Sequence, residues 1–169
     1  GVSDAVLHTL RVPVLLVGPR VTSGVALDSG RVVACLDESR ASERVLPPAR
    51  GWAQAFDLPL WLVHVAAPGE GSAGWESAAE RPAGRRLDAL AHALPGTAGW
   101  RLLHDRRPAR SLVSLAGTGL VAVLVLGTHG RTGWTRVRAG SVAASVVRDA
   151  IAPVLAVPAG PGGTHPGGG

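Results

Sequence analysis

The sequence predicts an α/β fold in which a five-stranded parallel sheet carries helices on both of its faces. Two observations support this prediction: five short apolar segments have the length of strands, and segments with helical spacing alternate with them. Continuously apolar strands are typical of parallel sheets, which are covered on both sides. Ligands bind such sheets at the carboxyl ends of the strands, where the strand order reverses.

The predicted strands and helices alternate along the chain. Strands are expected at residues 31–37, 58–66, 100–104, 120–126 and 153–157. Helices are expected at residues 40–56, 82–94, 108–116 and 140–150. Pro47 and Pro48 fall inside the first helix and should kink or restart it, whereas Pro82 and Pro108 stand at helix starts, where proline is favoured.

The first 18 residues look like a second copy of residues 141–158, because six positions are identical when the two segments are aligned. Any helix followed by Pro-Val-Leu could match in this way by chance. The stronger interpretation is that residues 1–18 are the last helix and strand of a preceding homologous domain in a tandem protein. The chain also starts without methionine, as expected of a fragment or a processed chain.

The remaining chain divides into three further parts under this interpretation. Residues 19–30 form a linker rich in Gly and Ser, residues 31–158 form the main domain, and residues 159–169 form a Gly/Pro tail that should be disordered. Residues 13–17 and 153–157 are both apolar and nearly identical in sequence. We therefore expect these two strands to pair antiparallel, since so apolar an edge is rarely left in water.

Composition excludes several functional classes. With 46% hydrophobic residues the 169-residue chain can bury a core, and no apolar run reaches the ~18 residues of a membrane span. The single cysteine, Cys35, excludes internal disulfides and multi-cysteine zinc sites. All 17 basic residues are Arg, so a phosphate-loop lysine and a Schiff-base lysine are excluded. The net charge of +5 comes from scattered arginines, and nucleic-acid binding is not expected.

One segment carries the clearest functional signal. Its pattern is a strand followed by Gly127-x2-Gly130-x9-Gly140-Ser141 at the start of a helix. Glycines allow the backbone to approach a ligand, and a helix start offers free N–H groups and a positive dipole end to an anion. Arg131 adds positive charge on the intervening loop. In the alternative interpretation the glycines only make turns and Ser141 is only a helix cap.

Other residues allow weaker interpretations. Asp37 follows the first strand of the main domain, where an acid can accept hydrogen bonds from a ribose; an ordinary turn carboxylate is the alternative. A Ser141–His129–Asp37 triad lacks any nucleophile-elbow motif. Gly69-x-Gly71-x2-Gly74 has dinucleotide spacing but no suitable helix start after it, so we expect a plain loop. No His/Asp/Glu cluster has the spacing of metal ligands.

With these motifs in view, residues 31–158 resemble the universal stress protein family. The glycine spacing, the Val-Leu-Gly-Thr-His-Gly lead-in and the Pro-Val-Leu-x-Val ending all match the ATP-binding type of that family. The resemblance implies a Rossmann-like domain with adenine nucleotide in a cleft. Carried over by position, it assigns Asp37 to the ribose, Cys35 and Val65 to the adenine pocket, Leu126, Gly127 and Gly130 to the ribose–phosphate side, and Gly140, Ser141 and Val142 to the phosphates.

The function implied is an ATP-binding regulatory module of the cytoplasm, with Mg²⁺ held mainly by the phosphates. Hydrolysis should be slow or absent, because the sequence offers no positioned general base. Two alternatives stay open: a scaffold or dimerisation domain with an empty site, and a true hydrolase or adenylyl transferase. The resemblance also implies pairing of two domains through the last strand at residues 153–157, within one chain or between two chains. No membrane partner is expected.

Overall fold

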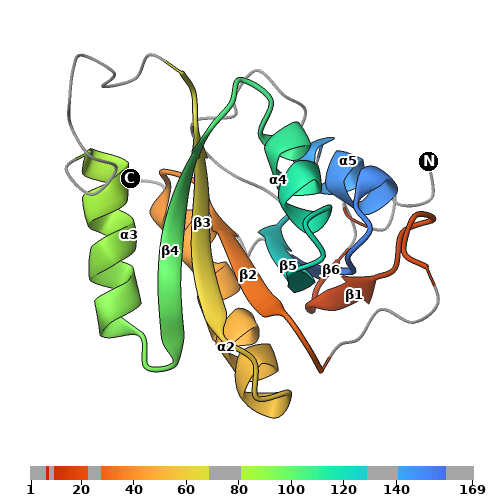
Figure 1. Ribbon diagram of the computed structural model, residues 1–169, viewed down its shortest axis with the longest axis horizontal. Helices are drawn as coiled ribbons and strands as arrows, with labels where there is room; N and C mark the ends of the chain where they lie inside the picture. The colour runs from red at the N-terminus through yellow and green to blue at the C-terminus, as the bar shows by residue number, and fades with distance from the viewer. Residues whose placement is uncertain (1–6, 8–9, 23–27, 69–80, 129–140, 159–169) are drawn as a thin grey trace, which may run out of the picture.

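A computed structural model of the chain describes residue 7 and residues 10–22, 28–68, 81–128 and 141–158. In these residues six strands form a single sheet in the order β1-β6-β5-β2-β3-β4 (Figure 1). β1 runs antiparallel to β6, and the other neighbouring strands are parallel. The α/β class and the parallel sheet predicted from the sequence are thus confirmed, with one additional strand.

The six strands have well-defined bounds. They are β1 (Val14–Leu16), β2 (Arg31–Leu36), β3 (Leu60–Ala66), β4 (Thr97–His104), β5 (Val121–Gly127) and β6 (Val154–Val157). β2 to β6 correspond to the five expected strands, and β1 comes from the segment expected to pair with the last of them. β5 is almost wholly buried, as an inner strand covered on both faces should be.

The helices also fall where the sequence pattern places them. They are the 3₁₀ helix η1 (Arg40–Val45), α2 (Leu46–Ala55), α3 (Pro82–Ala93), α4 (Pro108–Ala116) and α5 (Ser141–Asp149). The helix expected at residues 40–56 is in fact two helices. α2 begins immediately before Pro47, so both prolines lie in a first turn whose N–H groups need no intrahelical partner. The predicted restart at the proline pair is confirmed.

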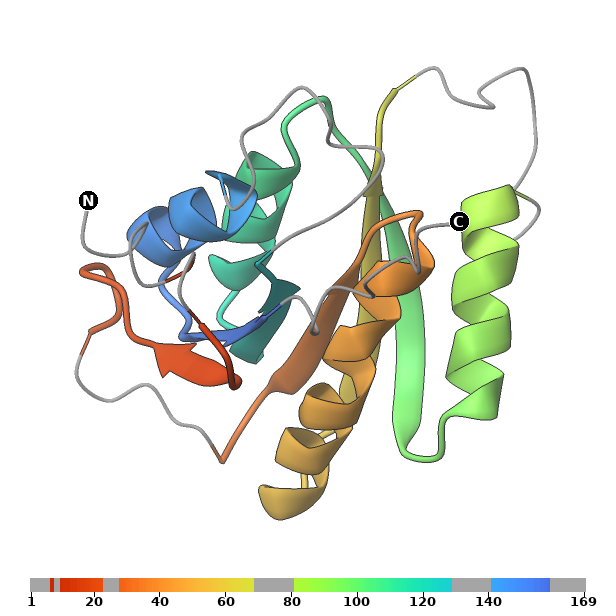
Figure 2. The same ribbon diagram turned by 180° about the vertical axis from the view of Figure 1, so that it is seen from behind.

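Helices cover the two faces of the sheet in pairs. α2 and α3 lie on one face and α4 and α5 on the other, as the two opposite views show (Figures 1 and 2). Successive strand residues point to opposite faces, so each strand contributes to both cores. In β2, Ala34 and Leu36 pack in the cluster with α2 and α3, whereas Val33 and Cys35 pack in the cluster with α4 and α5.

β1 is an integral part of the sheet. It pairs with β6 in the register Val14–Ala156, Leu15–Leu155 and Leu16–Val154, which confirms the antiparallel pairing expected from the sequence. Gly18, just after β1, lies directly against α5: a Cβ there would come within 1.8 Å of the carbonyl oxygen of Val147. Only glycine allows this approach. The helix expected within residues 1–18 lies mostly outside the described residues, and the tail at residues 159–169 lies wholly outside them.

The helices described here are short. Among the described residues, no helix combines the length and apolar character needed to cross a membrane.

Candidate functional site

The strand order reverses between β2 and β5. From β2 the chain continues outward through β3 to β4, whereas β5 is followed by β6 on the other side. β2 and β5 are parallel neighbours, paired through Ala34 and Val125 among others, so their carboxyl ends lie side by side. This is the switch point at which α/β sheets bind ligands.

Four of the residues assigned to the nucleotide by resemblance come together at this point. Cys35, Val65, Leu126 and Val142 belong to one buried cluster, on the face that α4 and α5 cover. They arrive from three strands and from the first turn of α5. We call these four residues the apolar floor. An apolar surface at the switch point is suited to a flat heteroaromatic ring, whose faces need no hydrogen bonds.

Cys35 has no nucleophilic character in this position. Its side chain is buried, and burial raises the pKa of the thiol from 9.0 to about 12. The sulfur has only a weak contact, 3.9 Å from the carbonyl oxygen of Val33. A neutral thiol of this kind is a small core side chain.

Asp37 organises the turn that follows β2. Its Oδ1 accepts hydrogen bonds from the backbone N–H of Ser39 at 2.7 Å and from the Ser39 hydroxyl at 2.5 Å. Ser39 in turn caps η1, because its hydroxyl oxygen accepts from the backbone N–H of Ser42. Asp and Ser are favoured in such turns because their side chains bond to nearby backbone groups. The local sequence Asp-Glu-Ser-Arg-Ala-Ser therefore fixes the backbone at the end of β2.

Arg86 of α3 holds the same turn from the other side. Its guanidinium donates to the carbonyl oxygens of Asp37 and Ser39 at 3.0 and 2.9 Å, and to the carboxylate of Glu43 at 2.8 Å. A planar guanidinium can satisfy several acceptors at fixed angles, which a lysine could not. Sequence reasoning missed Arg86. The only available signal was an arginine directly beside Leu87 on the apolar side of an amphipathic helix.

The second carboxylate oxygen of Asp37 remains available. Among the described residues, no hydrogen bond is made to Oδ2, while Oδ1 has two donors. The side chain is half-buried at the carboxyl end of β2, next to the apolar floor. A ligand hydroxyl could therefore donate to Oδ2 while Oδ1 keeps the turn in place.

The glycine motif is described only at its two ends. Gly127 closes β5 opposite Val157 of β6, and the backbone N–H of the buried Thr128 donates to the Val157 carbonyl oxygen at 2.9 Å. α5 begins at Ser141, the last residue of the motif. Gly130, Arg131 and Gly140 lie outside the described residues, as do His129 and the side chain of Ser141. Their assigned roles stay predictions from the sequence.

The weaker motifs gain no support. Gly69, Gly71 and Gly74 lie outside the described residues, and so do two members of the imagined triad. Within the part of the chain that the structure describes, no three His, Cys, Asp or Glu side chains are placed to hold a metal ion.

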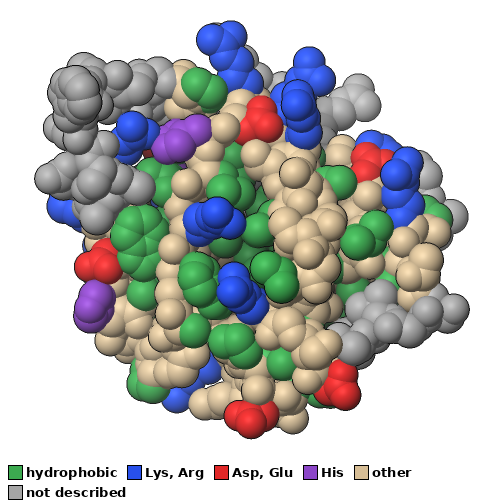
Figure 3. Space-filling model, in the orientation of Figure 1, with side chains coloured by type: hydrophobic (Ala, Val, Ile, Leu, Met, Phe, Trp, Pro, Cys, Tyr) green, Lys and Arg blue, Asp and Glu red, His purple; other side chains and the backbone are tan. Residues whose placement is uncertain are grey.

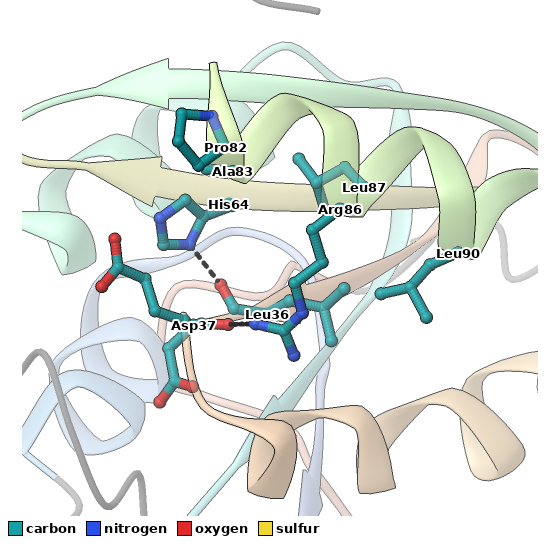
Figure 4. Close-up of a pocket in the computed structure, with 9 residues that line it drawn as sticks. Leu36, Asp37, His64, Pro82, Ala83, Arg86, Leu87 and Leu90 are labelled. Carbon is teal, nitrogen blue, oxygen red and sulfur yellow. Dashed lines mark hydrogen bonds between the residues drawn. The ribbon is translucent and has the colours of Figure 1, made fainter. Parts of the chain in front are cut away.

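A separate pocket opens on the α3 side of the same turn (Figure 4). It measures about 280 Å³ and is lined mainly by Leu36, Asp37, His64, Ala83, Arg86 and Leu87. We call it the α3 pocket. His64 lies next to Val65 in β3 and therefore faces the opposite side of the sheet from the apolar floor. No motif in the sequence points to His64.

The surface over β3 and β4 mixes cationic and apolar side chains. In Figure 3, arginines lie among hydrophobic side chains over these two strands. The guanidinium of Arg31 stacks 4.5 Å from the centre of the Trp61 ring, a cation–π contact. Because Arg31 lies over the Trp61 ring, this surface does not present a continuous row of basic side chains.

The profile of the Universal stress protein family matches residues 29–158. The chain belongs to the universal stress protein family. A curated universal stress protein from Methanocaldococcus jannaschii is 30% identical over 139 residues, which cover 75% of this chain and 81% of that protein.

Solved structures agree with this assignment. The universal stress protein from Archaeoglobus fulgidus in complex with dAMP is 27% identical, with a TM-score of 0.56 over 76% of this chain and 97% of its own. Another A. fulgidus universal stress protein shares the fold at a TM-score of 0.68 and 20% identity. That match covers 95% of this chain and 56% of the longer protein.

Proposed function

We propose that this universal stress protein binds an adenine nucleotide, with ATP as the main ligand, at the carboxyl ends of β2, β3 and β5. The observation that carries the proposal is the meeting of the apolar floor with Asp37 at the switch point of the sheet. The floor offers an apolar surface to the base, and Oδ2 of Asp37 is free to accept from a ribose hydroxyl. A relative of known structure was solved in complex with dAMP.

The phosphates would lie toward the start of α5. The N-terminal turn of this nine-residue helix has backbone N–H groups without intrahelical partners, and its dipole favours an anion. The motif Gly127-x2-Gly130-x9-Gly140-Ser141 leads into that turn. Mg²⁺ would be held mainly by the phosphates.

We infer a regulatory role with slow or no hydrolysis rather than rapid turnover. Fast phosphoryl transfer needs a group that orients or deprotonates the attacking water. Among the described groups at this edge, Cys35 is a neutral buried thiol and His64 faces the other side of the sheet. The carboxylate of Asp37 is held by Ser39 and is assigned to the ribose. The proposed compartment is the cytoplasm, where ATP is supplied.

We further propose that β1 marks the seam of a tandem protein. Its antiparallel pairing with β6 and the close contact of Gly18 with α5 support a strand that belongs to a neighbouring homologous domain. In the absence of that domain, the same edge would favour self-association of two chains, because β1 contributes only three residues and leaves the exposed Val12 and Val17 beside it.

Mass spectrometry of the purified protein tests nucleotide binding most simply. The protein should retain an adenine nucleotide, seen as absorbance near 260 nm and as a released mass after denaturation. A nucleotide-free protein that also fails to bind added ATP would favour the scaffold alternative. Turnover of labelled ATP well above background would favour an enzyme instead.

A further inference from the structure

The α3 pocket contains an almost fully buried polar side chain with a single hydrogen bond to the described residues. His64 is only 5% exposed and lines a cavity of about 280 Å³. In Figure 4 its ring enters the pocket from β3, Arg86 enters from α3, and Leu36 lies between them. A cavity of this size holds several waters or one small organic molecule.

The tautomer of His64 follows from its one hydrogen bond. Its Nδ1 lies 2.9 Å from the carbonyl oxygen of Leu36, an acceptor, so Nδ1 carries the proton and donates. The other ring nitrogen, Nε2, therefore presents a lone pair in the neutral ring. Among the described residues, Nε2 has no hydrogen-bond partner. Because His64 lines the pocket, a donor group of a ligand in the pocket can reach this nitrogen.

The remaining polar groups of the pocket are acceptors as well. Arg86 could have offered an anion site, but its guanidinium is already bonded to two carbonyl oxygens and to the carboxylate of Glu43. Its charge is thereby paired at 2.8 Å. Asp37 also lines the pocket, but its carboxylate is bonded to Ser39 and points away from His64 (Figure 4). Glu38 lines the pocket without an ion pair to another described residue, so it leaves one uncompensated negative charge at the pocket wall.

The other walls are apolar. Leu87 and Leu90 of α3 face Leu36 of β2, and Pro82 and Ala83 close the end near the start of α3. A suitable ligand therefore needs an apolar body and a positively charged donor at one end.

We propose that the α3 pocket is a binding site for a small amine with an apolar body. The ammonium group donates to Nε2 of His64 and is attracted by Glu38, while the body packs on the leucines. This site lies on the opposite face of the sheet from the apolar floor. It is independent of the proposed nucleotide site, apart from the turn at Asp37 that both touch.

Three probes of matched shape test the charge requirement. ¹⁵N-labelled protein would be titrated with 2-phenylethylamine, 2-phenylethanol and 3-phenylpropionate near pH 7.5. The amine should shift the amide signals of Leu36, His64 and Leu87 and should bind roughly tenfold or more tightly than the alcohol, as a charge-assisted hydrogen bond implies. Equal or tighter binding of the carboxylate, or no binding of any probe at these residues, would overturn the proposal.

Matched variants on α3 locate the site. Ala83→Phe places a ring in the pocket and should abolish amine binding. Ala89→Phe makes the same change on an exposed position of the same helix and should leave it unchanged. If both variants bind the amine equally, the pocket is not the site.

A pair of His64 variants tests the acceptor. His64→Leu removes the lone pair and should weaken amine binding at least about tenfold. His64→Gln keeps one donor for Leu36 and one acceptor for the ligand and should bind almost normally. Retained binding in a folded His64→Leu protein contradicts the proposal, and if that variant does not fold, the α3 pair decides. ATP binding, followed at Leu126 and Val142, is measured in every variant, so failure of either site is seen separately.

Discussion

The two sides of the sheet differ sharply at the edge where β2 and β3 end. On the α4/α5 side, Cys35, Val65 and Leu126 present sulfur and hydrocarbon. On the α3 side, the neighbouring strand positions present Leu36 and His64, beside the half-buried ion pair of Arg86 with Glu43. Successive side chains of a strand point to opposite faces of the sheet, so two neighbouring residues can serve chemically different sites. Asp37, at the boundary, touches both.

The largest expected contrast concerns the reactivity of Cys35, on the apolar side. Burial raises the pKa of the Cys35 thiol to about 12. Only the thiolate reacts with iodoacetamide, so alkylation at pH 8 should be about a thousandfold slower than in the unfolded chain. Alkylation rates in buffer and in urea measure this. A folded protein that reacts within a factor of ten of the unfolded one would show that the apolar side is open to water.

The same group predicts a loss of stability at alkaline pH. The thiol pKa is higher in the folded than in the unfolded state. The contribution of the neutral thiol to the free energy of unfolding is therefore complete below pH 9 and declines as pH rises from about 9 toward 12. Cys35→Ala should remove this part of the decline in urea melts. An alkaline decline of unchanged size in the variant would assign it to other groups.

Substitution of Asp37 tests the boundary between the sides. Asp37→Ala should weaken ATP binding by roughly 1.5–3 kcal/mol, as loss of one or two hydrogen bonds to a charged acceptor implies, and should weaken inorganic triphosphate much less. Glu38→Ala is the matched control and should leave ATP affinity nearly unchanged. Equal losses for ATP and triphosphate in Asp37→Ala would mean that Asp37 does not contact the ribose.

A change at the phosphate end should affect one side only. Gly140→Val puts a branched side chain immediately before α5 and should weaken ATP binding at least about tenfold, or 1.4 kcal/mol. Binding of 2-phenylethylamine in the α3 pocket should not change. Calorimetric titration of both ligands measures the difference. Unchanged ATP affinity in the folded variant would contradict the phosphate assignment, and weaker binding of both ligands would indicate general damage.

The smallest effect is expected at Asp105, between β4 and α4. Asp105 accepts from the backbone N–H of Arg107 at 2.9 Å and from the Ser111 hydroxyl at 3.2 Å, and these bonds at the start of α4 help to lower its pKa. A carboxylate whose pKa is lowered in the folded state stabilises the fold above about pH 4. This stabilisation is lost as pH falls through the folded-state pKa. Asp105→Asn should lower the melting temperature slightly at pH 7 and not at pH 3. If the melting temperatures still differ at pH 3, the effect comes from the altered side-chain geometry and not from the carboxylate charge.

The sheet could be predicted from the sequence because its inner strands are short, continuously apolar segments, which are typical of parallel sheets covered on both faces. β4 was the least well predicted: it begins at Thr97 rather than residue 100, because an edge strand with Thr97, Ala98 and Gly99 lacks a strong apolar pattern. The proline pair revealed the restart of α2 because proline is tolerated in a first turn. Local rules were sufficient for these elements.

The site was only partly predictable for a physical reason. Asp37 and the apolar floor follow from strand ends and from the family motif. The bond from Arg86 to the Asp37 carbonyl joins residues 49 apart, and that from His64 to Leu36 joins residues 28 apart. No local sequence pattern encodes contacts between residues so far apart. The α3 pocket is therefore visible only in the structure, where α3 packs on the sheet.

The most direct measurement is an ATP titration of ¹⁵N-labelled protein, read at backbone amides on both sides of the sheet. Binding of adenine nucleotide on the α4/α5 side predicts large shifts at Cys35, Val65, Leu126 and Val142, with Leu87 and Leu90 nearly unmoved. No saturable shift, or shifts confined to α3, would contradict the proposed nucleotide site.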